Sequence, residues 1–179
     1  MKQHILITGE RGAGKSTLLW RLQRELCCPV YGFRTVREAA DKTGFHPIYI
    51  HAAAEPREQY RFSQENLVGI CNGRQHDVRI AAFDTLGAAY IDAAQPGGVI
   101  IMDELGFMEK EAENFKRAVL AALDGDIPVI AAVKARQDVD FLNEVRRHPK
   151  AVLVAVTPEN REALFRQLHK AGEPDTKHK

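Results

Sequence analysis

A glycine-rich turn near the amino terminus limits the choice of fold more than any other part of this 179-residue chain. The turn reads GERGAGKS over residues 9–16 and fits the pattern G-x-x-x-x-G-K-[ST] at every fixed position. An apolar run, His4–Thr8, precedes it, and a helical pattern over Lys15–Leu26 follows it. Because this strand–turn–helix order is the context that the pattern requires, the sequence predicts a P-loop for the phosphates of a nucleotide.

Each residue type in the turn has a physical role. Glycine lets the backbone wrap with its amides pointing inward, where side chains would obstruct a phosphate. The helix after the turn adds its positive dipole end, Lys15 adds a compact charge for the β- and γ-phosphates, and the Ser16 hydroxyl is a ligand type for Mg²⁺. The predicted nucleotide-binding residues of the turn are Gly9, Glu10, Arg11, Gly12, Ala13, Gly14, Lys15, Ser16 and Thr17.

Two adjacent carboxylates follow a second apolar run, Val99–Met102. In P-loop proteins the first acidic residue after such a strand reaches the Mg²⁺, so we predict Asp103 as a metal residue together with Ser16. Adjacent strand residues point to opposite sides, so Glu104 cannot repeat that role. We predict Glu104 as the catalytic base that activates water, beside Lys15 as the other catalytic residue. In the plainer alternative, Asp103 only caps a turn and Glu104 is only solvated.

The remaining chain alternates unbroken apolar runs with helical periodicity, which indicates a parallel sheet covered by helices on both faces. We therefore predict an α/β, three-layer P-loop fold with a mostly parallel sheet of about five strands. A catalytic glutamate beside the metal aspartate marks the additional-strand division of this fold. The predicted organisation is a single domain over residues 1–171, with an irregular β-rich insert over 30–76 and a flexible tail over 172–179.

Composition excludes some partners. The 25 basic and 24 acidic side chains give a net charge of +1, so bulk charge does not favour nucleic acid or an anionic membrane. No apolar run approaches membrane-spanning length, and the start of the chain leaves no room for a signal peptide. Three cysteines, an odd number, suit a reducing compartment. We expect a cytoplasmic protein whose protein partner, where there is one, the sequence does not name.

Several short motifs occur in an order that resembles the thermophilic-type nucleoside-triphosphatase family, also called cancer-related nucleoside-triphosphatase. The resemblance covers roughly residues 4–168, nearly the whole chain. Its more specific parts are DELG-x-ME over 103–109 and VTPENR over 156–161. Members are P-loop NTPases of the additional-strand type that hydrolyse several nucleoside triphosphates with Mg²⁺, so the resemblance implies the same activity and the same cofactor here.

The chain departs from the family pattern at two places. Phe107 stands where the family commonly has Lys, which removes a positive charge close to the acidic pair. A catalytic role of that lysine is therefore absent, and turnover could be slower or differently controlled. The family also commonly has a more basic, glutamate-containing stretch around Thr35–Lys42. In this chain Arg37 and Glu38 could take the place of those family residues.

Other side chains carry weaker signals. Asn160 and Arg161 follow the last predicted strand at the edge where α/β sheets bind ligands, so we predict that they flank the base, while helix capping by Thr157 is the structural alternative. Lys134 and Arg136 could sense the γ-phosphate or belong to a solvated loop. Trp20 is expected in the core. Scattered arginines that could act as a charge-stabilising finger, or only be solvated, are Arg57, Arg61, Arg74 and Arg79.

The predicted function is a Mg²⁺-dependent nucleoside-triphosphatase that hydrolyses the γ-phosphate of ATP, GTP and other nucleoside triphosphates. Two alternatives remain open. The first is a nucleotide or small-molecule kinase whose acceptor would bind within residues 30–76, against which the chain has no clear arginine-rich lid. The second is a nucleotide-dependent binding switch whose partner controls turnover.

Overall fold

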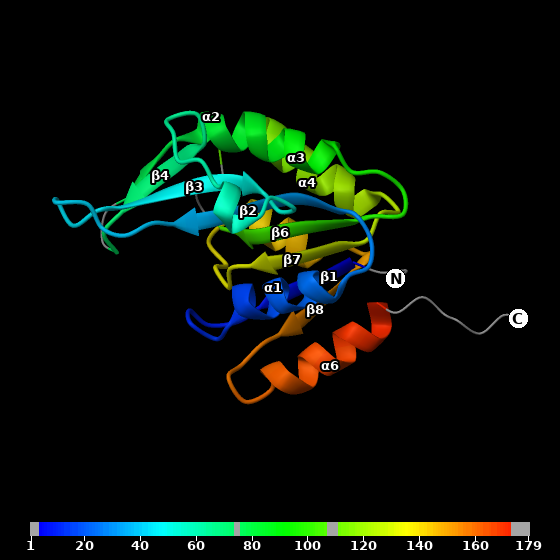
Figure 1. Cartoon of the computed structure of the whole chain (residues 1–179). Coiled ribbons are helices and arrows are strands. Elements are labelled where there is room, and N and C mark those ends of the chain that lie inside the picture. Colours follow the sequence, from blue (N-terminus) through cyan, green and yellow to red (C-terminus); the bar gives the residue numbers. More distant parts are fainter. Residues whose placement is uncertain (1–3, 74–75, 107–110, 173–179) are drawn as a thin grey trace, which may run out of the picture.

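The computed structural model describes residues 4–73, 76–106 and 111–172. These residues form one eight-stranded sheet with the order β5-β4-β3-β2-β6-β7-β1-β8. Figure 1 shows the sheet through the middle of the molecule. Its strands are β1 (His4–Thr8), β2 (Val30–Arg37), β3 (His46–Ala52), β4 (Leu67–Cys71), β5 (His76–Val78), β6 (Val99–Leu105), β7 (Val129–Val133) and β8 (Ala151–Ala155).

Five neighbouring strands, β2-β6-β7-β1-β8, pair in parallel. Strand β7 lies between β1, which leads into the phosphate turn, and β6, which carries the acidic pair. This arrangement confirms the predicted additional-strand topology and the mostly parallel sheet. Apolar side chains occupy both faces of these strands, as expected where helices cover a parallel sheet on both sides.

The total of about five strands was too low, because the β-rich middle of the chain does not form a separate excursion. Strand β3 pairs antiparallel with β2, β4 with β3, and β5 with β4, so three strands extend the same sheet. The edge of β2 offers unpaired backbone N–H and C=O groups, and this antiparallel extension satisfies them. Residues 30–76 therefore continue the central sheet.

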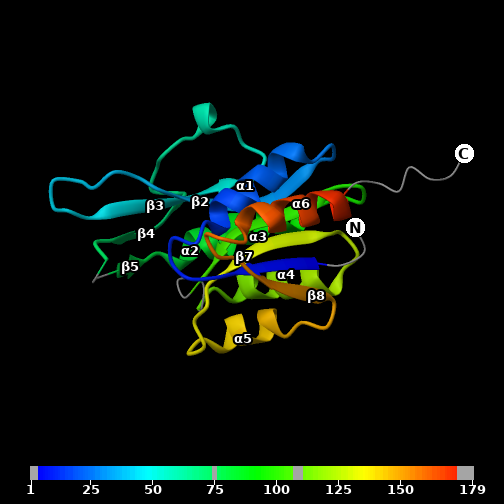
Figure 2. The same cartoon turned by 90° about the horizontal axis from the view of Figure 1, so that it is seen from below.

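Helices form the two outer layers. Figures 1 and 2 show α1 and α6 on one face of the sheet and α4 and α5 on the other. The helical elements are α1 (Lys15–Glu25), the short turn η1 (Arg57–Gln59), α2 (Ile80–Ala82), the π-helical turn η2 (Phe83–Gly87), α3 (Ala88–Asp92), α4 (Glu113–Asp124), α5 (Asp140–Arg146) and α6 (Arg161–Gly172).

The core is divided by the sheet into two apolar clusters. The larger one packs α2, η2, α3, α4 and α5 on one face. Within it the Phe115 ring meets Phe33 edge to face and lies tilted against Phe83. The smaller one packs α1 and α6 on the other face, around Leu18 and Leu19. The two clusters hold β1, β6 and β7 rigidly between them, which fixes the loops at the ends of these strands.

The helical segment from Ile80 to Asp92 is interrupted by η2, a π-helical turn between α2 and α3. Trp20 is half-buried, so its prediction as a core residue is wrong. Its ring instead lies against the guanidinium groups of Arg24 and Arg57, at 4.9 Å and 5.5 Å from the ring centroid. The tail predicted over 172–179 begins at the last residue of α6 and continues outside the described residues.

Candidate nucleotide site

The carboxyl ends of the parallel strands bring the predicted site residues to one edge of the sheet. Strand β1 ends at the phosphate turn, β6 carries Asp103 and Glu104, and β7 is followed by Lys134. In open α/β sheets ligands bind at this edge, where the connections diverge. Residues far apart in sequence are thereby placed within hydrogen-bond distance of the turn.

The phosphate turn depends on glycine at its last position before α1. Gly14 has a φ of +93°, in the left-handed region, and is the N-cap residue that directly precedes α1. A Cβ atom there would lie 2.7 Å from Nη1 of Arg161. Glycine is therefore required both for the backbone conformation and for the close approach of the α6 arginine.

Lys15 is held at the centre of the turn. The residue is only 8% exposed, and its ammonium donates hydrogen bonds to the carbonyl oxygens of Gly9, at 3.0 Å, and Glu10, at 3.1 Å. Its Nζ also lies 3.3 Å from Oε1 of Glu104. A buried cation is thus paired with the carboxylate that we predict as the catalytic base.

Ser16 and Asp103 form a second contact between the turn and β6. The Ser16 hydroxyl donates a 2.8 Å hydrogen bond to Oδ1 of Asp103, and the Thr35 hydroxyl donates a 3.1 Å bond to the Asp103 carbonyl. No group of three or more acidic, cysteine or histidine ligands occurs among residues 4–73, 76–106 and 111–172. Mg²⁺ needs no such cage, since one or two carboxylates, a hydroxyl and substrate phosphates suffice, and the pair Ser16–Asp103 fits that donor set.

Asp103 is 7% exposed, and this burial raises the pKa of its carboxyl above the ordinary range. The hydrogen bond from Ser16 and the charges of Arg34 and Lys15 act in the opposite direction. The carboxylate is therefore costly to keep ionised, because burial disfavours the charged form. A cation bound at this point would favour ionisation.

A cavity of about 530 Å³ opens in front of the turn. Its walls include Glu104, Lys134 and Arg136, and its floor includes Arg11 and Lys15. Lys134 Nζ lies 3.9 Å from Oε2 of Glu104, so two lysines flank this carboxylate. The volume suits a small-molecule ligand, and the predominance of cations on the wall suits phosphate groups.

The sequence profile of a protein family described as NTPase matches residues 4–169. The chain belongs to this NTPase family. That result confirms the resemblance noted from the DELG-x-ME and VTPENR motifs.

The match with each of three curated relatives covers almost the whole length of that relative. Nucleoside-triphosphatase THEP1 of Aquifex aeolicus is 33% identical over 92% of this chain and 96% of its own, and that of Methanocaldococcus jannaschii is 31% identical over 92% and 94%. The cancer-related nucleoside-triphosphatase homolog of Bos taurus is 28% identical over 94% and 95%. The crystal structure of THEP1 from Aquifex aeolicus superposes with a TM-score of 0.74 at 26% identity, covering 96% and 99% of the two chains.

Asn160 and Arg161 of this NTPase take different positions. The Asn160 side chain accepts a hydrogen bond from the Thr157 amide at 2.8 Å and donates one to the Ala155 carbonyl at 2.9 Å, so it closes the turn before α6. Arg161 extends toward Gly14, and its buried Nε has no hydrogen-bond partner among the described residues. Arg161 is therefore next to the phosphate turn, whereas Asn160 shapes the segment that brings it there.

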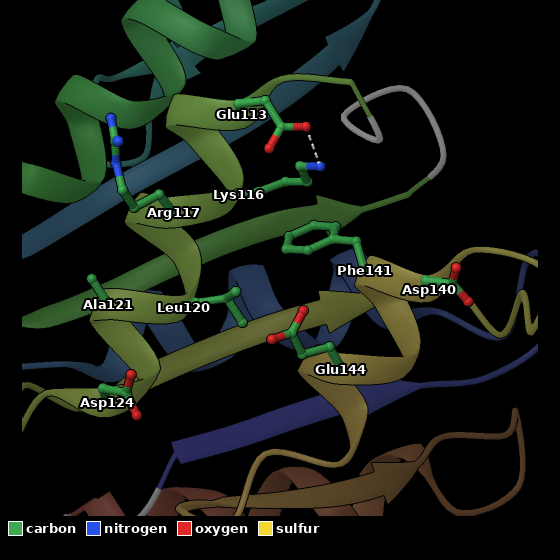
Figure 3. Close-up of a pocket in the computed structure, with 9 residues that line it drawn as sticks. All are labelled: Glu113, Lys116, Arg117, Leu120, Ala121, Asp124, Asp140, Phe141 and Glu144. Atoms are coloured by element: carbon green, nitrogen blue, oxygen red, sulfur yellow. Dashed lines mark ion pairs between the residues drawn. The ribbon is translucent and has the colours of Figure 1, made fainter.

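A second hollow, of about 540 Å³, lies between α4 and α5, away from the turn (Figure 3). Figure 3 shows the ion pair between Glu113 and Lys116 at its upper rim and Phe141 projecting toward its centre. Its lining carries four carboxylates and two cations, which does not suit a phosphate ligand. The charged lining residues are Glu113, Asp124, Asp140, Glu144, Lys116 and Arg117.

Sequence reasoning missed Arg34, which is buried at 5% exposure within β2, opposite Asp103 on β6. A charged residue directly after Phe33 in a β-prone run was the available signal. Phe107, Met108, Glu109 and Arg74 lie outside the described residues. Within the described part of the chain no helix has the length and apolar character to cross a bilayer.

Proposed function

We propose that the chain is a Mg²⁺-dependent nucleoside-triphosphatase that hydrolyses the γ-phosphate of ATP, GTP and other nucleoside triphosphates. The observation that carries the proposal is the convergence of Lys15, Glu104, Ser16 and Asp103 at the phosphate turn. The names of the relatives, which include nucleoside-triphosphatase, support it. Their sequences also align over nearly the whole chain.

In this proposal the turn and Lys15 bind the β- and γ-phosphates and stabilise the charge that develops on the transferred phosphoryl group. Ser16 and Asp103 hold Mg²⁺, which neutralises phosphate charge when bound. The nucleotide-binding residues are Gly9–Thr17 together with Arg161, and Asn160 acts by shaping the turn that carries Arg161.

Glu104 is the proposed base. Its carboxylate orients a water for in-line attack on the γ-phosphorus and accepts a proton from it. This carboxylate pairs with Lys15 and Lys134. An incoming triphosphate would compete for both cations and so leave Glu104 available to water, because phosphate oxygens bind ammonium groups as strongly as a carboxylate does.

The test is phosphate release from ATP, GTP, CTP and UTP, each with Mg²⁺ and with chelator. We expect release that requires Mg²⁺ and differs only modestly among the bases. Equal release with chelator would remove the metal from the mechanism. Transfer of the γ-phosphate to an added acceptor much faster than to water would favour a kinase instead.

The cytoplasm is the proposed location, since Cys27, Cys28 and Cys71 are all free thiols and fit a reducing compartment. The proposed ligand is the nucleoside triphosphate. Neither the charge balance nor the site supports nucleic acid as a partner.

A further inference from the structure

A separate cleft of about 660 Å³ lies on the α1 side of the sheet, between α1, the end of β2 and the segment that joins β3 to β4. It shares only Arg37 with the cavity in front of the turn, among the lining residues of the two. Ser16, Thr17 and Asp103 form its inner end, so the cleft begins where the metal residues are. The proposed hydrolysis assigns no role to the rest of its wall.

The cleft contains a buried positive charge with no charged hydrogen-bond partner. Within the described part of the chain, the guanidinium of Arg34 donates to Oε1 of Gln23 at 2.5 Å and to the Tyr60 hydroxyl at 3.3 Å, both uncharged. Arg34 acts electrostatically on Asp103, but that carboxylate already accepts a bond from Ser16. A buried cation is costly unless an anion compensates it, so this wall of the cleft favours an anionic ligand.

Aromatic rings form another part of the wall. Tyr60 is stacked on the buried His51 ring, at 3.9 Å between centroids and 19° between planes, which fixes its position. Phe62 is 45% exposed, and Trp20 is half-buried with Arg57 above its ring. Rings held at the mouth of a cleft beside guanidinium groups are a common way to bind a nucleobase and its phosphate together.

The charge balance of the lining agrees with this ligand class. Three arginines, Arg34, Arg37 and Arg57, face two carboxylates, Glu38 and Asp103, and the second of these is the proposed metal residue. The lining is therefore net positive by one charge, and a cation bound at Asp103 would make it more positive. Its volume is within the range of small-molecule sites.

We propose that this cleft is a second ligand site that binds a free nucleoside monophosphate, with the base against Trp20 and the phosphate at Arg34 and Arg57. The ligand would lie next to a triphosphate held by the turn, on the side of Ser16 and Asp103. This assigns to Trp20, Arg34 and Arg57 a binding role that hydrolysis does not need.

The experiment is calorimetric titration with AMP and GMP of the protein already saturated with Mg²⁺ and a non-hydrolysable triphosphate analogue. We expect one further binding site per chain for at least one of the two. Adenosine and inorganic phosphate each correspond to one part of AMP, so each should bind more weakly than AMP. Absence of a second binding event for both monophosphates would overturn the proposal.

Trp20→Ala and Arg57→Ala are the informative variants, since both side chains are at least partly exposed and neither belongs to the proposed hydrolytic machinery. Each should weaken monophosphate binding at least about fivefold, as expected for loss of one stacking or phosphate contact. Arg24→Ala is the matched control, because Arg24 also lies over the Trp20 ring but does not line the cleft. It should change the affinity less than twofold, and equal losses in all three variants would contradict the assignment.

Two further measurements separate this inference from the proposed function. Lys15→Ala should lose triphosphate binding yet keep monophosphate binding in the cleft, since Lys15 does not line it. If Trp20→Ala and Arg57→Ala instead weaken binding of the triphosphate analogue, the cleft holds the nucleoside of the triphosphate itself, and the second site does not exist.

Discussion

Asp103 and Glu104 are neighbours in the sequence, but their side chains meet opposite surroundings. Asp103 is buried and hydrogen-bonded to a hydroxyl, whereas Glu104 is half-exposed between two lysines. The first environment raises the pKa of Asp103 through burial, and a bound cation would compensate for it. The second environment places the Glu104 carboxylate beside two lysines that a triphosphate would engage. The different surroundings fit the two roles that we propose for this dipeptide.

Asp103→Asn should raise the melting temperature of the metal-free protein at neutral pH. Burial raises the folded-state pKa of Asp103, so ionisation disfavours the native state. The free energy of unfolding is highest below the unfolded-state pKa of Asp103 and falls as the pH rises through its folded-state pKa. Asn cannot ionise, so the variant avoids this fall. Melting curves in chelator from acidic to neutral pH should therefore diverge only as the pH rises.

The same variant should respond poorly to Mg²⁺, because a negative charge at the proposed metal site is lost. The half-saturating Mg²⁺ concentration for phosphate release is the measurement. Asp140→Asn, in the hollow between α4 and α5, is the control and should behave as the parent does. Identical half-saturation in Asp103→Asn and the parent would exclude Asp103 as the metal carboxylate.

Glu104→Gln should reduce single-turnover hydrolysis by about 10²–10⁴-fold, the usual contribution of a positioned general base. The amide retains size and hydrogen bonding but cannot accept the proton. Triphosphate binding should persist or tighten, since Lys15 and Lys134 lose a competing anion. Single-turnover rates beside equilibrium binding of a non-hydrolysable analogue separate the two effects. Glu144→Gln is the control, and hydrolysis within a few-fold of the parent in Glu104→Gln would remove Glu104 from the mechanism.

At the scale of elements, the contact between the turn and α6 gives a test of geometry. Gly12 and Gly14 both have positive φ, at +84° and +93°. Alanine at either position should cost about 1–2 kcal/mol of stability, the usual penalty for a side chain in the left-handed region. Only at Gly14 would the new Cβ also meet Arg161; nothing lies within 4 Å at Gly12.

Gly14→Ala should therefore weaken triphosphate binding more than Gly12→Ala does, at similar cost to the free energy of unfolding. Denaturant melts and binding titrations on the two variants provide the comparison. Adding Arg161→Ala should change the stability of Gly14→Ala less than it changes that of Gly12→Ala, because the Cβ at position 14 already displaces the Arg161 side chain from the turn. Additive effects in both backgrounds would show that Arg161 and the turn do not interact.

The elements that the sequence predicted well are those encoded by local patterns. The P-loop, the acidic pair in β6 and the parallel strands each have a short, contiguous signature. The extension of the sheet by β3, β4 and β5 depends on antiparallel register between distant segments, with a shift between Ile48 and Tyr49, which no local pattern reports. Trp20 and Arg34 were missed for the same reason, since their surroundings come from residues 53–66 as well as from α1 and β2.

At the scale of the molecule, the proposed site draws on four separate segments: the turn after β1, the end of β6, the loop after β7 and the start of α6. The sheet holds all four at one edge, with β7 between the strand of the turn and the strand of the carboxylates. A ligand that contacts all of them stabilises the native arrangement of the sheet and not the unfolded chain.

A Mg²⁺-bound non-hydrolysable triphosphate analogue should therefore raise the melting temperature of the whole protein. At about 100 times its dissociation constant a ligand adds about 2.7 kcal/mol. In a chain of this length that corresponds to roughly 5–10 °C. Lys15→Ala should lose most of this shift, because its ammonium is the buried charge that we propose to bind the phosphates, and Lys116→Ala on α4 should retain it. Differential scanning calorimetry of the three proteins, with and without the analogue, makes the comparison. An equal shift in Lys15→Ala and the parent would mean that the analogue binds elsewhere than at the turn.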